Sequence, residues 1–193
     1  MPSSPFDSFI AARSLVDGSS LAGEPVVPSS PAVEQDILVL FDCYASPLLR
    51  YVASFGLTPQ ESEDVVQDTF VALFQHLSLG RPRSNLRAWL FQVAHNLALR
   101  HRRTARRKHA GDRSLYTAAD PGPDPETQLA ERQRRRRLRA AAEALPERER
   151  RCLLLRAQGL RYREIARTLG VSLGAVAKSL SRAMTRLMNA DGR

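Results

Sequence analysis

Apolar residues in this chain recur three and four positions apart, which is the spacing of a helix that buries one face. One stripe holds Val66, Phe70, Leu73, Phe74 and Leu77, and a second holds Leu86, Leu90, Val93, Ala94 and Leu97. No segment alternates apolar and polar residues convincingly, as a half-buried strand would. The pattern therefore predicts an all-α fold.

Capping residues locate several of the predicted helices. Thr58 suits an N-cap, Pro59 the first helical position and Glu61 the third, which together make a capping box. Asp124–Pro125 is a similar pair at the start of a helix that reaches about residue 145, and Pro146 opens the next helix.

Changes in composition divide the 193 residues into four parts. Residues 1–32 are rich in Ser, Pro and Gly, which predicts a mostly disordered tail. Residues 110–124 have the composition of a flexible linker. Between and after these lie two helical segments, 33–109 and 125–190. The sequence thus predicts two small helical domains joined by a linker that permits many relative placements.

A helix-turn-helix is predicted within residues 162–184. Two helices that cross over a short turn need a small residue where they touch, and Ala166 supplies it. Gly170 can take a positive φ at the end of the first helix, and Ser172 can cap the second. The second domain is therefore expected to be a four-helix domain with a helix-turn-helix. A plain helical hairpin with a cationic outer face is the alternative.

The second helix of this motif has an inner and an outer face. Val176, Leu180, Ala183 and Leu187 form one apolar stripe, which is expected to face inward. Short residues and cations are left on the outside, as suits a helix whose N-terminal half enters a major groove. The outward residues are Leu173, Ala175, Lys178, Ser179 and Arg182.

The net charge of +9 is Arg-heavy and clustered, which favours a polyanionic partner such as nucleic acid over a merely solvated surface. One helix carries Trp89 and Phe91 ahead of a dense basic run, a combination that could bind single-stranded DNA. The alternatives are core packing for the aromatic residues, which we favour for Trp89, and a solvated helix end for the arginines.

An acidic helix face stands out in so basic a chain. Asp64 and Asp68 lie one turn apart, beside Gln67 and Val71. Like charges at this spacing cost a few tenths of a kcal/mol. An acidic, partly apolar face of this kind suggests a protein partner, and an ordinary solvated face is the alternative.

Several classes of function are disfavoured. The sequence has no phosphate-binding glycine loop, no H-E-x-x-H and no convincing nucleophile–base set, so we expect neither an enzyme nor a cofactor. Cys43 and Cys152 are far apart and are interpreted as small core residues in a reducing compartment, without a metal site. The sequence shows no long apolar run and no secretory signal, which favours a cytoplasmic protein without membrane insertion.

Together these segments resemble the short, two-domain extracytoplasmic-function sigma factors of bacterial RNA polymerase. The resemblance covers about residues 36–108 and 126–189, in the family's order. It is carried by SEDVVQDTFVALFQHL, by SNLRAWLFQVAHNLALRHRR and by LPERERRCLLLRAQGLRYREIARTLGVSLGAVAKSLSRAMTRL. It implies a protein that binds core polymerase, recognises and melts a promoter, and starts transcription.

The resemblance also implies roles for particular residues. Asp64, Gln67 and Asp68 match the family's D-x-x-Q-[ED] pattern, so core-polymerase binding is expected at these residues and at Val71. Capture of the melted −10 strand is expected of Asn85, Arg87, Asn96, Arg100, Arg102 and Arg103. Recognition of the −35 duplex is expected of Arg161, Ser172, Leu173, Gly174, Ala175, Lys178, Ser179 and Arg182. The implied partners are the β′ and β subunits of core RNA polymerase, promoter DNA and an anti-sigma factor.

The reading helix departs from the common family pattern G-T-V-[KR]-S-R. This chain has Ala175 in place of Thr, and its basic residue, Lys178, is displaced by one position, about 100° around the helix. The departure suggests an unusual −35 preference. The competing hypothesis is a stand-alone, LuxR-like regulator that binds duplex DNA as a dimer without polymerase.

Overall fold

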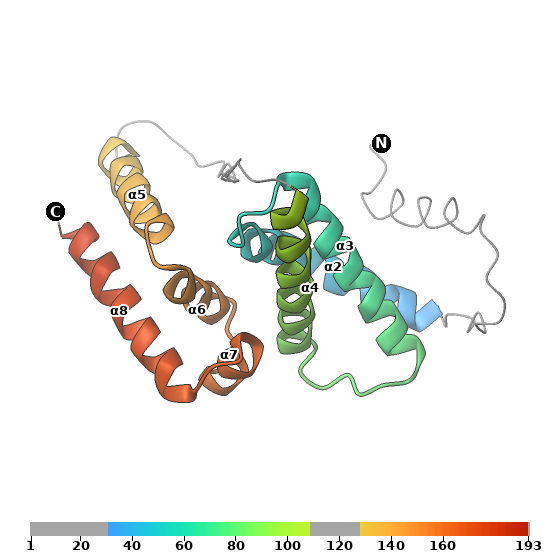
Figure 1. Cartoon of the computed structure of the whole chain (residues 1–193). Coiled ribbons are helices and arrows are strands. Elements are labelled where there is room, and N and C mark those ends of the chain that lie inside the picture. The colour runs from blue at the N-terminus through green and yellow to red at the C-terminus, as the bar shows by residue number, and fades with distance from the viewer. Residues whose placement is uncertain (1–30, 109–127, 193) are drawn as a thin grey trace.

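The structure is a computed structural model that describes residues 31–108 and 128–192. Within these ranges the chain folds into seven α-helices and contains no strand, so the all-α prediction is confirmed (Figure 1). The tail predicted for 1–32 lies outside the described residues except for its last two positions, and the linker predicted for 110–124 lies wholly outside them.

The first domain consists of α2 (Pro31–Ala53), α3 (Pro59–Ser78) and α4 (Leu86–Lys108). The predicted capping box at the start of α3 is present: the Thr58 hydroxyl accepts from the Glu61 amide at 3.2 Å, and the Glu61 carboxylate accepts from the Thr58 amide at 2.8 Å. The helices pack through the predicted apolar stripes, with Phe70, Leu73 and Leu90 fully buried. The local signals thus place α3 with its acidic face outward.

A polar contact lies in the middle of this core. The Tyr51 hydroxyl and His95 Nδ1 are 2.8 Å apart and both side chains are buried. The rings of Phe55 and Phe91 surround them in edge-on contacts. The pair links the end of α2 to the middle of α4.

The second domain consists of α5 (Gln128–Glu143), α6 (Glu147–Ala157), α7 (Tyr162–Leu169) and α8 (Leu173–Asp191). The long α8 contacts all three other helices of this domain. Near its C-terminus Asp191 accepts from Arg134 of α5, with Nη2 and Oδ2 2.6 Å apart. The predicted four-helix domain with a helix-turn-helix is therefore present.

The two domains pack against each other. Helix α7 lies beside the lower end of α4, and α6 contacts α2 (Figure 1). The buried apolar residues of both domains form one continuous cluster. At the junction, Arg150 donates to the Ser54 carbonyl at 2.9 Å, and the Arg151 guanidinium lies 4.0 Å from the centre of the Phe55 ring. The second domain thereby covers the turn that ends α2.

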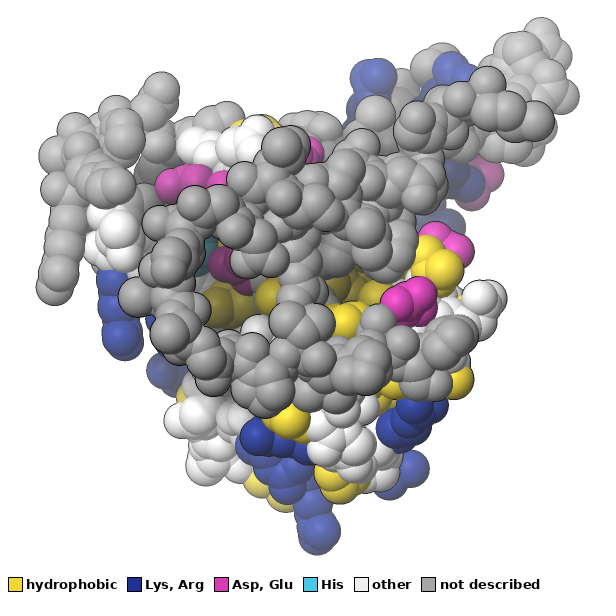
Figure 2. All heavy atoms as spheres, turned by 90° about the vertical axis from the view of Figure 1, so that its right-hand side faces the viewer, with side chains coloured by type: hydrophobic (Ala, Val, Ile, Leu, Met, Phe, Trp, Pro, Cys, Tyr) yellow, Lys and Arg dark blue, Asp and Glu magenta, His cyan; other side chains and the backbone are white. Residues whose placement is uncertain are grey.

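One end of the molecule is rich in cations. Seen from the first domain, Lys and Arg side chains gather at the lower end, where Figure 1 places the loop after α3 and the turn between α7 and α8 (Figure 2). Among the helices of the described ranges, none combines the length and the apolar character needed to cross a bilayer.

Candidate polymerase and promoter interfaces

The acidic face of α3 points away from the core of the first domain. Gln67 and Asp68 are exposed, while Asp64 and Val71 are partly exposed. Internal contacts on this face are weak: Gln60 reaches Asp64 at 3.5 Å, and His101 lies 3.9 Å from Asp68. The opposite side of the helix is buried through Val65, Val66 and Phe70, so the four predicted residues share an accessible surface.

The loop 79–85, between α3 and α4, is held by His76, Arg83 and Asp36, which the sequence analysis did not single out. His76 stacks on Trp89, with ring centres 4.6 Å apart, and its Nε2 lies 3.0 Å from the Pro82 carbonyl. Arg83 forms an ion pair with Asp36 of α2. These contacts join the loop to all three helices of the first domain. No local sequence signal marks them.

Asn85 ends this loop with φ +60°, a left-handed conformation that Asn tolerates better than most residues. Its carbonyl accepts from the Trp89 amide at 3.1 Å, so Asn85 is the residue that caps the start of α4. Its side-chain amide donates to Glu164 of the second domain, with Nδ2 and Oε1 2.8 Å apart. The side chain therefore faces the helix-turn-helix.

Helix α4 divides the remaining predicted −10 residues between two faces. Asn96, Arg100 and Arg103 are exposed and lie four and three residues apart, on one stripe. Arg102 instead turns to the second domain and binds Glu147, with Nη1–O distances of 3.2 and 3.1 Å. Arg87 is only partly exposed and lies against Gly159. The structure thus brings together only half of this set on an open surface.

The helix-turn-helix has the predicted local geometry. Gly170 takes φ +64° in the left-handed region, and the Ser172 hydroxyl accepts from the Ala175 amide at 3.2 Å. Leu173, Gly174, Lys178 and Arg182 are exposed, and Ala175 is partly exposed. The start of α8 therefore presents short side chains followed by cations, as the sequence predicted.

One predicted −35 residue is misplaced. Ser179 was expected to face outward, but it is only 7% exposed and its side chain lies beside Cys152 of α6. Because α6 packs directly over this part of α8, fewer residues of α8 face solvent than the apolar periodicity of α8 suggests. Burial also raises the pKa of the Cys152 thiol. The other cysteine, Cys43, is exposed, so its prediction as a core residue is wrong.

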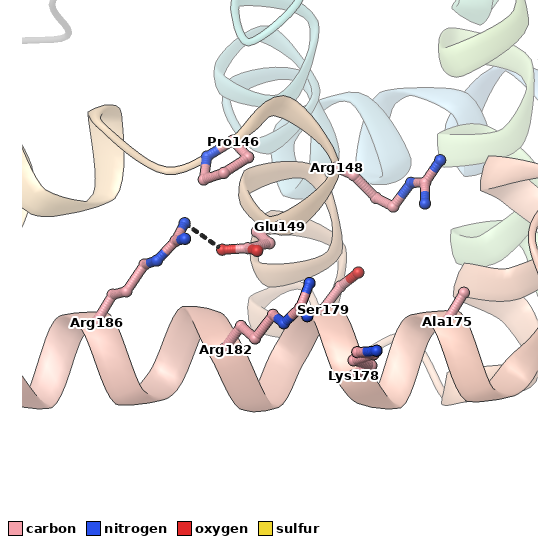
Figure 3. Close-up of a pocket in the computed structure, with 8 residues that line it drawn as sticks. All are labelled: Pro146, Arg148, Glu149, Ala175, Lys178, Ser179, Arg182 and Arg186. Atoms are coloured by element: carbon pink, nitrogen blue, oxygen red, sulfur yellow. Dashed lines mark hydrogen bonds and ion pairs between the residues drawn. The ribbon is translucent and has the colours of Figure 1, made fainter.

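A basic groove runs between α6 and α8 (Figure 3). Lys178, Arg182 and Arg186 lie four residues apart on α8, and Arg148 of α6 lines the same groove with its side chain extending away from Arg182 and Arg186 (Figure 3). Arg186 is engaged by the buried Glu149, with Nη1 and Oε2 2.8 Å apart. Arg148 and Arg186 were not among the predicted residues, although the four-residue spacing of the α8 cations is a signal that could have indicated Arg186.

Among the described residues, no three His, Cys, Asp or Glu side chains gather as metal ligands would.

Two family models match the chain. Sigma-70 region 2 matches residues 40–108, and Sigma-70, region 4 matches residues 135–187. The first contains α3, α4 and the loop between them. The second contains the helix-turn-helix and the basic groove.

Individual relatives agree with these models. The ECF RNA polymerase sigma factor SigL of Mycobacterium tuberculosis is 31% identical over 168 residues, which cover 83% of this chain and 92% of SigL. The probable RNA polymerase sigma factor RfaY of Xanthomonas campestris is 38% identical over 134 residues, and the match spans only 33% of its length. Among solved structures, the sigma factor RpoE of Bartonella quintana, in complex with the anti-sigma factor NepR, has a TM-score of 0.63 at 24% identity. That match covers 83% of this chain and 97% of RpoE. The chain therefore belongs to the extracytoplasmic-function sigma factors of bacterial RNA polymerase.

Proposed function

We propose that this sigma factor binds core RNA polymerase through the acidic face of α3 and holds promoter DNA with two separate basic surfaces. The observation that carries the first part is that Asp64, Gln67, Asp68 and Val71 share one accessible surface without a strong internal partner. Their match to the family's D-x-x-Q-[ED] pattern supports the β′ subunit as the partner.

The −10 strand is assigned to the loop 79–85 and to the open stripe of α4. A melted base has a free edge and its strand a free phosphate backbone, which a loop and a basic helix can hold. Asn96, Arg100 and Arg103 are exposed and available to the strand in the described structure. Strand separation needs no bond chemistry, because binding the single strand offsets the lost pairing and stacking.

The −35 duplex is assigned to the start of α8 and to the basic groove. Leu173, Gly174 and Ala175 are small or apolar enough to enter a major groove, while Lys178 and Arg182 follow one and two turns later. Arg148 widens the cationic surface on the α6 side. Arg161, which is exposed at the start of α7, is assigned a phosphate contact.

Regulation by an anti-sigma factor and action in the cytoplasm complete the proposal. The structural relative RpoE was solved with the anti-sigma factor NepR. The match to Sigma-70 region 2 disfavours the stand-alone LuxR-like regulator, because it covers the domain that such a regulator would use for sensing or dimerisation.

The test combines transcription with a charge reversal on α3. Promoter DNA is identified by sequencing the fragments retained by core polymerase with this chain, and run-off transcription is then measured. We expect Asp64→Arg with Asp68→Arg to reduce promoter-specific transcript at least roughly tenfold, the scale for reversing charges in an interface.

The matched control is Asp42→Arg with Glu143→Arg, which makes the same change of charge at exposed positions on other helices. The control should transcribe normally, and both variants should retain −35 duplex binding. An absence of any promoter-specific transcript from the wild-type chain with core polymerase would overturn the proposed function.

A further inference from the structure

The loop 79–85 carries two arginines whose surroundings differ. Arg83 is neutralised by Asp36 of α2. Arg81 is exposed, and within the described ranges no carboxylate forms an ion pair with its guanidinium. Lys and Arg side chains gather at the end of the molecule where Figure 1 places this loop (Figure 2). Arg81 is therefore a cation of the loop that can accept an anion from outside the chain.

The backbone on both sides of Arg81 is held by one residue, His76. The Arg81 amide donates to the His76 carbonyl at 3.2 Å, and the Pro82 carbonyl oxygen lies 3.0 Å from His76 Nε2. Because a carbonyl oxygen only accepts, Nε2 is the donor in this contact. The imidazole stacks in turn on Trp89 of α4, with ring centres 4.6 Å apart. His76 thus determines the place from which the Arg81 side chain extends.

Gly80 makes this double contact possible. It takes φ +65°, in the left-handed region where a residue with a Cβ is strained. Its amide donates to the Leu77 carbonyl at 3.0 Å, so the chain turns back over the last turn of α3. The reversal brings residues 81 and 82 beside His76.

An exposed guanidinium at this place suits a phosphate of a single strand. Guanidinium presents its donors as a planar fork that matches two phosphate oxygens. The loop leads into α4, whose open stripe carries Arg100 and Arg103. At 1.5 Å per residue, Arg100 lies roughly 20 Å along the helix from Leu86, about the length of six stacked nucleotides. A cation in the loop would therefore bind a different phosphate from those that reach the stripe.

Building on the proposed function, we propose that Arg81 binds a backbone phosphate of the −10 strand and that His76 is a positioning residue that acts through Arg81. His76 itself touches no DNA, because its ring is engaged by Trp89 and by the Pro82 carbonyl. The loop then uses its two arginines differently: Arg83 ties it to α2, and Arg81 contacts the strand.

The test measures DNA binding by the holoenzyme formed from core polymerase and the full chain. The probe is a labelled fork-junction DNA, made from the promoter identified above, whose non-template strand is unpaired across the −10 element. Arg81→Ala removes the proposed contact. Arg50→Ala is the control, because it removes an exposed cation from α2, a helix with no assigned DNA contact.

We expect Arg81→Ala to weaken binding roughly threefold to tenfold, the scale of one charge-assisted contact at an exposed site. The slope of log affinity against log salt concentration should fall by about 0.7, the value for one phosphate of a single strand. Arg50→Ala should change neither quantity. If Arg81→Ala binds the probe as the control does, the phosphate contact is overturned.

The role of His76 is tested by a second substitution in two backgrounds. His76→Phe keeps a ring against Trp89 but loses the hydrogen bond to the Pro82 carbonyl, so we expect it to weaken binding roughly twofold to tenfold. In the Arg81→Ala background it should have no further effect, since the side chain that it positions is gone. An equal loss in both backgrounds, or no loss in either, would overturn the positioning role.

These outcomes are distinct from a failure of the proposed function. That failure is an absence of promoter-specific transcript from the wild-type chain. A wild-type holoenzyme that transcribes from its promoter, combined with an Arg81→Ala holoenzyme that binds the probe normally, would overturn only the assignment of Arg81.

Discussion

His95 is a titratable side chain enclosed in the first domain. It is 5% exposed, contacts the Tyr51 hydroxyl, and interacts electrostatically with Arg151 and Arg102. Burial first, and then these two cations, lower the pKa of His95 from 6.5 to about 4. The folded protein therefore holds a neutral imidazole at this position under ordinary conditions.

This arrangement predicts a pH-dependent stability. Between pH 6.5 and 4 the unfolded chain binds a proton at residue 95 that the folded chain does not, so the free energy of unfolding falls as the pH falls. From pH 7 to pH 5 we expect a loss of about 1 to 2 kcal/mol from this residue. Urea unfolding of the wild type and of His95→Gln at both pH values checks it. An equal loss in the two proteins would contradict the assignment to His95.

Residue-scale predictions from the sequence succeeded where the signal was local. Gly170 and Ser172 were located because a left-handed C-cap and an N-cap each depend on a few neighbouring residues. Ser179 failed because its burial depends on Cys152, which comes from another helix. The prediction for Cys43 failed in the opposite sense: cysteine is usually buried, but Cys43 is exposed on α2.

The element that most directly links local structure to function is α8. Its first turn is fixed by the hydrogen bond from the Ala175 amide to Ser172, at the end proposed to enter the major groove. Removing this cap leaves an amide without its partner and loosens the turn that presents Leu173 and Gly174.

We therefore expect Ser172→Ala to lower the free energy of unfolding by about 1 kcal/mol and to weaken binding of a −35 duplex. Ser181→Ala, at an exposed position in the middle of the same helix, is the control and should change the free energy of unfolding by less than about 0.5 kcal/mol. Urea unfolding and fluorescence anisotropy measure the two effects. If Ser172→Ala binds the duplex as tightly as the wild type, the cap has no role in DNA recognition.

At the scale of elements, helices were predictable and the connection between α3 and α4 was not. The apolar stripes and the capping box of α3 follow from periodicity and short-range rules. The loop 79–85 instead takes its form from Asp36 and His76, and Asp36 comes from a different part of the chain. Arg83 and Asp36 are 47 residues apart, beyond the reach of any local pattern.

The whole molecule carries its positive charge in separate places, one of which is the groove between α6 and α8. Arg148, Lys178 and Arg182 line that groove within reach of a duplex backbone. Each phosphate that such a side chain neutralises releases counterions, so affinity should fall steeply with salt.

We expect Lys178→Ala with Arg182→Ala to reduce the slope of log affinity against log salt concentration by about 2, one for each lost phosphate contact. Arg135→Ala, which removes an exposed cation paired with Glu131 on α5, should leave the slope nearly unchanged. Titrations of a promoter duplex at several salt concentrations measure both. A flat salt response of the wild type would contradict the electrostatic role of the groove.

The placement of the domains is what the sequence could not supply. It is fixed by contacts such as Asn85 with Glu164, 79 residues apart, and Arg150 with Ser54, 96 residues apart. The flexible linker predicted for 110–124 sets no orientation by itself. The family models identify each domain, but the junction between the domains depends on individual side chains.

The anchoring of the loop 79–85 has a consequence for how selective the protein can be. A recognition segment that is already ordered loses little conformational freedom when its ligand binds. Because it does not rearrange, it cannot adjust its contacts to fit a mismatched ligand. The same rigidity makes the segment sensitive to length. One residue inserted between Pro82 and Asn85 would pull Arg83 out of register with Asp36 or Asn85 out of register with Glu164, whereas a loose tether would absorb it.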